Sequence, residues 1–159
     1  MSILLYTLGY EGLSFEVFLA RLKTVGVETV IDVRANPLSR KRGFSKHSLA
    51  AGLEGAGLAY KHTPAMGCPK NVRDQYKRDQ DWAVYTQGYL AYLASQPASL
   101  SELITIAESS SSCLICFEAD FTRCHRMYVA RAAARYAAFQ VRHLTAETEI
   151  AEEVDRSAA

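Results

Sequence analysis

The sequence has no apolar run that approaches the roughly 18 residues that a helix needs to span a bilayer. Its first residues, 1–6, also lack the basic segment and the small-residue cleavage site of a secretory signal peptide. Cysteine is scarce, with four residues in the chain, which argues against a small disulfide-stapled protein. We therefore expect a cytoplasmic protein whose thiols are reduced.

Internal repeats and domain linkers are also absent, and neither sign of charge dominates the chain as a whole. The 159 residues are 49% hydrophobic and 22% charged, which excludes a disordered or collagen-like chain and suffices to bury a core. The formal net charge of +1 is too small to indicate nucleic-acid binding by itself. We expect one domain over residues 1–145 and an acidic tail over residues 146–159.

Basic residues are nevertheless concentrated in the middle of the chain. Residues 34–78 contain ten arginines and lysines against Glu54 and Asp74, a formal charge of +8. Residues 145–159 contain five acidic residues and one basic residue, Arg156. This asymmetry indicates an anionic partner for the middle segment, and the alternative is a solvated basic loop that the acidic tail balances.

Short apolar runs alternate with segments of helical periodicity along the chain. Strands are predicted at residues 3–7, 29–33, 58–62, 113–117 and 141–144. Helices are predicted at residues 15–25, 45–54, 81–94, 98–107 and 123–138. Irregular structure is predicted for the loop 36–44 and around Pro64, Gly67 and Pro69. The expected fold class is three-layer α/β, with a mostly parallel sheet of about five strands and helices on both faces.

Polar and ionisable residues follow four of the predicted strands. Ligands of open parallel sheets bind beyond the carboxyl ends of the strands. Asp32 and Arg34 are two residues apart, so their side chains face the same side of an extended chain. They either form an ion pair that anchors the basic loop, or Arg34 binds a ligand anion while Asp32 orients it or takes a proton. The residues expected at this edge are Gly9, Tyr10, Asp32, Arg34, His62, Glu118 and Asp120.

Six short motifs occur in order along most of the chain. They are Thr-Leu-Gly-Tyr-Glu-Gly (7–12), Asp-Val-Arg-Ala-Asn-Pro (32–37), Gly-Phe-Ser (43–45), Tyr60 with His62, Cys-Phe-Glu-Ala (116–119) and Cys-His-Arg (124–126). In this combination the chain resembles, from residue 7 to residue 144, the family called domain of unknown function 488. The resemblance implies a compact α/β fold and a family-specific site, and it implies no particular reaction. Residues 31–34 and Cys116 also give a weaker, fold-level resemblance to rhodanese-like domains.

The cysteines near residue 116 have different expected surroundings. Cys113 and Cys116 are three residues apart on a strand and face opposite sides, so they cannot share a metal or form a disulfide. We expect Cys113 in the core. Cys116 ends the strand, where rhodanese-like enzymes carry their nucleophile, but the nearby carboxylates of Glu118 and Asp120 would raise the pKa of its thiol.

The next segment, residues 122–126, is expected to begin a helix. With Thr122 as the cap, Arg123, Cys124 and His125 would lie in the first turn. That helix end, with Arg126 beside it, would bind an anion and favour a Cys124 thiolate. The alternatives are a buried thiol beside surface arginines and a zinc site. The zinc ligands would be Cys116, Cys124 and His125 with His62 or Cys68, but the C-x7-C-H spacing matches no common pattern, so no metal is predicted.

Four aromatic residues share one helix face. Trp82, Tyr85, Tyr89 and Tyr92 follow at i, i+3, i+7 and i+10. The pattern is typical of a core stripe, and an exposed part of it near the basic loop could stack nucleobases.

Two classes of function fit these features. The first is a small enzyme on an anionic, phosphorylated substrate, with Asp32, Glu118, Cys124 and His125 as catalytic candidates. The substrate would be held by Gly9, Tyr10, Arg34, His62, Arg123 and Arg126. The second is a nucleic-acid-binding module that uses residues 34–78, and a rhodanese-like thiol enzyme is a further alternative. No cofactor is indicated.

Overall fold

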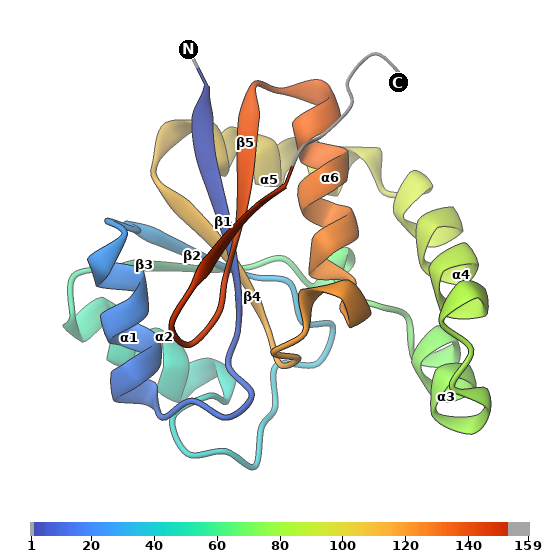
Figure 1. The fold of residues 1–159 in the computed structure, drawn as a ribbon, viewed down its shortest axis with the longest axis horizontal. Coiled ribbons are helices and arrows are strands. Elements are labelled where there is room, and N and C mark those ends of the chain that lie inside the picture. Colours follow the sequence, from blue (N-terminus) through green and yellow to red (C-terminus); the bar gives the residue numbers. More distant parts are fainter. Residues whose placement is uncertain (1, 153–159) are drawn as a thin grey trace.

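Six strands form one sheet at the centre of the computed structural model, which describes residues 2–152 (Figure 1). The strand order is β3-β2-β4-β1-β5-β6. The strands β1 to β5 all run parallel to one another, and β6 is antiparallel to β5. The strands are Ile3–Gly9 (β1), Thr29–Asp32 (β2), Ala59–His62 (β3), Ser112–Cys116 (β4), Phe139–Leu144 (β5) and Glu149–Glu152 (β6).

Six α-helices and two short 3₁₀ turns connect the strands within residues 2–152. Local sequence explains the limits of the first helix: the Ser14 side chain accepts a hydrogen bond from the Val17 N–H at 3.2 Å, and Gly26 follows the helix with φ of +79°. The elements are Phe15–Thr24 (α1), Lys46–Gly55 (α2), Pro64–Met66 (η1), Lys70–Asp79 (α3), Trp82–Ala94 (α4), Pro97–Ser109 (α5), Phe121–Arg123 (η2) and Arg126–Tyr136 (α6). In the described part of the chain, no helix combines the length and the apolar character needed to cross a membrane.

The strand side chains alternate between two hydrophobic clusters, because successive residues of a strand point to opposite faces of the sheet. Leu5, Ile31 and Leu114 pack in the cluster that contains the buried residues of α4, α5 and α6. Val30 and Ile115 pack in the cluster of α1 and α2. Helices therefore cover both faces of the sheet, and β2 and β4 are buried throughout (Figure 1).

The mostly parallel α/β sheet is confirmed, but the expected number of about five strands is corrected by β6. This strand lies inside the segment expected to be an acidic tail. Its carboxylates have basic partners: Glu149 accepts a hydrogen bond from Arg142 at 2.7 Å, and Glu152 contacts Arg131 and His143. The last part of that segment, residues 153–159 with Asp155 and Arg156, lies outside the described residues.

Helix α3 was not expected, since the sequence predicted irregular structure before residue 81. Its ten residues include none that is buried, so no apolar stripe marks it in the sequence. An i,i+4 pair on its surface, Lys70 and Asp74 at 2.6 Å, supports it instead. The start of α6 is also corrected, because the helix begins at Arg126 and not at Arg123.

Candidate functional site

The carboxyl ends of β1, β2, β3 and β4 meet at one edge of the sheet, since these strands are parallel. Gly9 is level with Cys116, and Asp32 is level with His62. Glu118 follows two residues after Cys116. The expected gathering of Gly9, Asp32, His62 and Glu118 near one edge is therefore confirmed.

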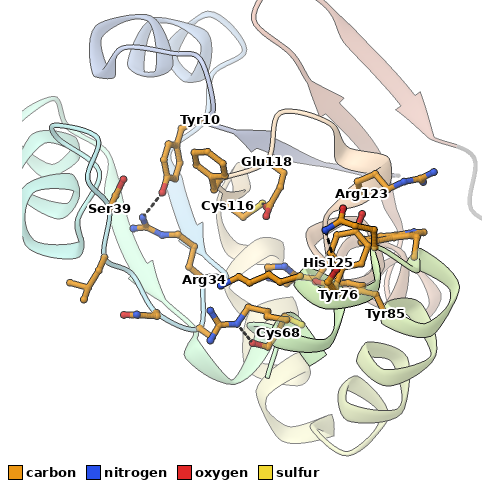
Figure 2. A pocket seen from close by; sticks show the side chains of 18 of the residues that line it. Tyr10, Arg34, Ser39, Cys68, Tyr76, Tyr85, Cys116, Glu118, Arg123 and His125 are labelled. Carbon is orange, nitrogen blue, oxygen red and sulfur yellow. Dashed lines mark hydrogen bonds between the residues drawn. The ribbon is translucent and has the colours of Figure 1, made fainter. Parts of the chain in front are cut away.

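A cavity of about 640 Å³ opens at this edge (Figure 2). That volume lies in the range of roughly 300–1,000 Å³ that is typical of small-molecule sites. Its basic lining residues are Arg34, Arg40, Arg73, Lys77, Arg123 and His125. Its aromatic lining residues are Tyr10, Tyr76, Trp82, Tyr85 and Phe117. Cys68, Cys116 and Glu118 also line it.

Asp32 and Arg34 form the ion pair that their spacing allows. Arg34 donates from Nε and Nη2 to the two carboxylate oxygens of Asp32, at 2.9 and 2.8 Å. Its Nη1 donates to the Tyr10 hydroxyl at 3.1 Å and to the Phe44 carbonyl at 2.6 Å. Burial alone would lower the pKa of Arg34, but the hydrogen bonds and charge of Asp32 outweigh it and raise the pKa. One donor of Arg34 thus anchors the basic loop at Phe44, and the others that are engaged hold Asp32 and Tyr10, so most donors of Arg34 are not available to a ligand.

Two neighbours complete the surroundings of this pair. Tyr60 donates its hydroxyl to Asp32 Oδ2 at 2.6 Å, and burial together with this carboxylate raises the pKa of the phenol. His62 donates from Nε2 to the Arg34 carbonyl at 2.8 Å. His62 is half-buried and is not among the residues that line the cavity. The two side chains thus support the β2 end and not the cavity wall.

Cys116 is the centre of a second cluster, which opens onto the cavity. Its Sγ is bonded to that of Cys124, while Cys68 and Cys113 are free. The expectation that all four thiols are reduced is therefore corrected. Glu118 Oε2 lies 3.3 Å from Cys116 Sγ, and burial raises the pKa of this half-buried carboxyl. Cys113 packs on the opposite face of the sheet in the core, as expected.

Arg126 is fully buried directly behind this cluster. Its Nη1 donates to the Glu118 carbonyl at 2.5 Å and approaches Cys116 Sγ at 3.2 Å, while its Nε donates to Thr7 Oγ1 at 3.1 Å. It forms no ion pair with any carboxylate of residues 2–152. Burial lowers the pKa of Arg126 to about 10. The guanidinium thus faces Cys116 and not the open cavity.

The turn before α6 differs from the expected capped helix start. Asp120, and not Thr122, accepts the first backbone N–H, that of Thr122 at 2.9 Å, and the turn 121–123 is a separate 3₁₀ segment. Cys124 follows this turn in an extended conformation, so it does not occupy a first helical turn. The expected reason for a Cys124 thiolate, a helix N-terminus around it, is therefore wrong. His125 is the residue before α6.

His125 is a buried, neutral imidazole beside the end of β2. Its Nε2 donates to the Val33 carbonyl at 2.7 Å, which leaves Nδ1 as the acceptor nitrogen. That Nδ1 lies 4.0 Å from Cys124 Sγ. Burial lowers the pKa of His125 to about 4, so the ring carries no charge at neutral pH.

Some residues that line the cavity were not expected there. Arg73 and Lys77 were expected only as phosphate contacts of the basic segment 34–78, and Tyr76 was not singled out, but all three belong to the unexpected helix α3 and line the cavity from it. A polar chain also leads away from Arg126: Thr7 lies 2.6 Å from His143 Nδ1, and His143 Nε2 contacts Glu152. For the residues of α3, the i,i+4 spacing of Arg73 and Lys77 was a usable signal in the sequence. The polar chain that leads away from Arg126 joins residues from both ends of the protein, so no local sequence pattern indicates it.

The sulfur and oxygen ligand atoms of Cys116, Glu118 and Cys124 lie within 4.8 Å of one another, which is close enough for a metal ion. This set shares Cys116 and Cys124 with the zinc alternative, whereas His125 turns one ring nitrogen to a carbonyl. The buried guanidinium of Arg126 is in contact with one of the three groups, Cys116. A second cation at this place would be repelled at short range.

The aromatic stripe of α4 contributes to both core and cavity. Tyr85 and Tyr89 are buried in the main cluster, as expected for a core stripe. Trp82 stacks on Tyr85 with ring centroids 4.3 Å apart, and both rings line the cavity. The Arg123 guanidinium lies 5.6 Å from the centroid of the Trp82 ring. One end of the stripe is therefore a flat wall of the cavity beside a cation.

The fold and this edge define an α/β protein with a basic, aromatic-walled cavity at the carboxyl ends of its strands. The chain belongs to the family described as Domain of unknown function DUF488, whose model matches residues 14–133. This confirms the resemblance drawn from the six motifs and gives no rhodanese-like relationship. No curated protein and no solved structure matches the chain.

Proposed function

We propose that the protein is a small enzyme whose cavity binds an anionic, phosphorylated molecule that carries a planar ring. The observation that supports this proposal best is a group of cations around the cavity. Four cations of the lining form no ion pair within residues 2–152, so their charge is available to a ligand. These four residues are Arg40, Arg73, Lys77 and Arg123.

The cavity walls favour a ring next to the anionic group. Arg73 uses its Nε to hold the Cys68 carbonyl at 3.1 Å, which orients the rest of the guanidinium. A guanidinium can hold a phosphate through two parallel hydrogen bonds. The stacked Trp82 and Tyr85 rings offer an aromatic surface to a planar group beside these cations. The substrate class is therefore a phosphorylated compound with an aromatic or heteroaromatic ring, such as a nucleotide.

The catalytic candidates at the cavity are Glu118 and Cys116. Burial raises the pKa of Glu118, which favours a role in proton transfer, and this carboxyl lines the cavity beside the sulfur of Cys116. Asp32 has both oxygens committed to Arg34 and Tyr60, which suits a supporting role. His125 is fixed as a neutral acceptor next to Cys124.

Calorimetric titration with adenosine monophosphate, guanosine monophosphate, adenosine and inorganic phosphate tests this proposal. We expect the monophosphates to bind more tightly than either adenosine or phosphate. The double variant Arg73→Ala/Lys77→Ala should lose at least tenfold in affinity, about 1.4 kcal/mol. The matched control is Lys70→Ala/Arg78→Ala, which removes the same charge from the same helix outside the cavity lining. Absence of binding by both nucleotides up to millimolar concentration, or equal losses in both double variants, would contradict the proposal.

Nucleic-acid binding by residues 34–78 makes a different prediction for the same variants. Counterion release would give affinity for an arbitrary oligonucleotide a steep dependence on salt. Both double variants would then weaken binding alike, since each removes two cations from one surface. The cations that line the cavity favour the small ligand, because Arg73 and Lys77 converge on it with Arg40 and Arg123.

A further inference from the structure

The disulfide partners Cys116 and Cys124 have unequal access to the cavity. Cys116 ends β4 and lines the cavity, whereas Cys124 lies behind it and is not part of the lining. Both side chains are 1% exposed, so the cavity is the route to Cys116. A thiol pair in which one sulfur borders the cavity and the other does not is the arrangement of an attacking and a resolving cysteine.

The surroundings of Cys116 Sγ stabilise a negative charge there. The Arg126 guanidinium approaches the sulfur at 3.2 Å and has no carboxylate partner within residues 2–152. Glu118 Oε2 lies 3.3 Å from the same sulfur and can hold the proton that the thiol gives up. When the disulfide opens, a thiolate at Cys116 supplies the counter-charge that the buried guanidinium otherwise lacks. The guanidinium thus opposes the repulsion of a Cys116 thiolate that the carboxylates of Glu118 and Asp120 alone would cause.

Cys124 has its own polar neighbour. The acceptor nitrogen of His125, Nδ1, lies 4.0 Å from Cys124 Sγ, because Nε2 is held by the Val33 carbonyl. This nitrogen can accept the S–H hydrogen of Cys124 in the reduced state. Each sulfur of the pair thus has a polar group for its proton.

We propose that Cys116 and Cys124 form a redox-active dithiol–disulfide pair that exchanges with a low-molecular-weight, anionic disulfide admitted by the cavity. The inference rests on the proposed function only for the charge of that substrate. The assignment makes Cys116 the attacking thiolate and Cys124 the resolving thiol.

The exchange balances in two steps. Cys116 Sγ attacks one sulfur of the substrate disulfide, forms a mixed disulfide and releases the other half of the substrate as a thiolate. Cys124 then attacks Cys116 Sγ, which forms the intramolecular disulfide and releases the second thiolate. The substrate gains two electrons and the protein loses two. A low-molecular-weight thiol, reacting by the same steps in reverse, returns the pair to the reduced state.

A metal at the same sulfurs is the competing interpretation, and the charges oppose it. Only three ligand groups converge there in residues 2–152, and one of them, Cys116, already contacts a guanidinium. A divalent cation would stand next to that buried positive charge.

The test uses the fully reduced chain and 5,5′-dithiobis(2-nitrobenzoate), an aromatic disulfide with two carboxylates. Wild type should release two aryl thiolates per chain in a fast phase and end with the Cys116–Cys124 disulfide and no bound aryl group. Cys124→Ser should release one aryl thiolate and retain the other on Cys116, as intact-mass and peptide mapping would show. Cys116→Ser should lose the fast phase. Cys68→Ser is the matched control, since Cys68 also lines the cavity, and it should keep the fast phase.

Three results would overturn the proposal: an aryl group retained on Cys116 of wild type, a fast phase unchanged in Cys116→Ser, or zinc bound by the reduced chain that blocks the exchange and is released in Cys124→Ser. The neutral probe 2,2′-dithiodipyridine separates the two proposals. If it reacts through the same two cysteines as fast as the anionic probe, the redox pair stands and the anionic cavity fails. If the nucleotides bind but the two-step exchange is absent, the redox pair alone fails.

Discussion

Gly9 lies against the backbone of Glu118 so closely that a Cβ atom at position 9 would overlap the Glu118 carbonyl oxygen. The same carbonyl accepts the Arg126 Nη1–H at 2.5 Å. The backbone of β1 thus fixes the loop that places both Glu118 and Arg126 around Cys116. Glycine is required here for close approach and not for its backbone angles.

Gly9→Ala should therefore disturb this loop. We expect a loss of about 1–3 kcal/mol in the free energy of unfolding, since backbone must move to make room for the methyl group. Exchange with the aryl disulfide should slow as well, because Arg126 loses its acceptor. Urea unfolding and aryl thiolate release measure the two effects. The control is Gly55→Ala at the end of α2, where nothing lies within 4 Å of the added carbon, and equal effects in both variants would contradict the prediction.

Asp32→Asn should be strongly destabilising. Asp32 is fully buried and accepts two hydrogen bonds from the Arg34 guanidinium, one from the Arg34 backbone N–H and one from Tyr60. Removal of its charge leaves the Arg34 guanidinium buried without a counterion, which costs about 3–5 kcal/mol. Chemical unfolding measures this loss. Tyr60→Phe removes one hydrogen bond to the same carboxylate and should cost about 1.5–3 kcal/mol, and the prediction is wrong if the two variants rank in the reverse order.

His125 should make the protein less stable in mild acid. The unfolded chain protonates this histidine near its ordinary pKa of 6.5, whereas burial holds the folded pKa at about 4. Between these values the unfolded state binds more protons, so the free energy of unfolding falls as the pH falls. From pH 6.5 to pH 5 this contributes a loss of about 2 kcal/mol.

Unfolding curves at both pH values for wild type and His125→Asn measure the effect. The variant should be less stable at pH 6.5 and should show a flatter dependence on pH. A direct check is the titration of the His125 ring by NMR. A midpoint near 6.5 in the folded protein would disprove the buried neutral state.

Trp82 should report on the cavity, because it is the single tryptophan of the chain and lines the cavity wall. We expect adenosine monophosphate to quench its emission by stacking near the ring, and inorganic phosphate to leave the emission nearly unchanged. Fluorescence titration gives the affinity, which should agree with calorimetry. Trp82→Phe removes the signal and serves as the blank. Equal quenching by phosphate and nucleotide would show that no ring reaches the wall.

The relationships that sequence could predict are those between near neighbours or equivalent strand ends. Asp32 and Arg34 are two residues apart, and the alternation of a strand brings them together. The common edge follows from the alternation of strands and helices. The contact of Arg126 with Cys116 could not be found in this way, because the chain turns back through a 3₁₀ segment between them.

Contacts between residues far apart in the sequence could not be predicted, for a physical reason. Thr7 and Arg126 are 119 positions apart, and Thr7 and His143 are 136 apart, so only the pairing of β1 with β5 and the packing of α6 join them. Helix α3 was not predicted from the sequence because it buries no residue and thus lacks a periodic pattern of apolar residues. Four residues that line the cavity wall belong to it or end it: Arg73, Tyr76, Lys77 and Gln80.

The place of β1 in the sheet has a practical consequence for anyone who shortens this chain. β1 lies between β4 and β5, yet it precedes the segment 14–133 that the family model matches, and β5 and β6 follow that segment. A fragment trimmed to the matched segment would lose a middle strand, and β4 would be left with an unpaired edge. It would also lose Gly9, Tyr10 and Thr7, on which the loop, the cavity and Arg126 depend. The smallest piece worth expressing begins before Ile3 and extends through Glu152.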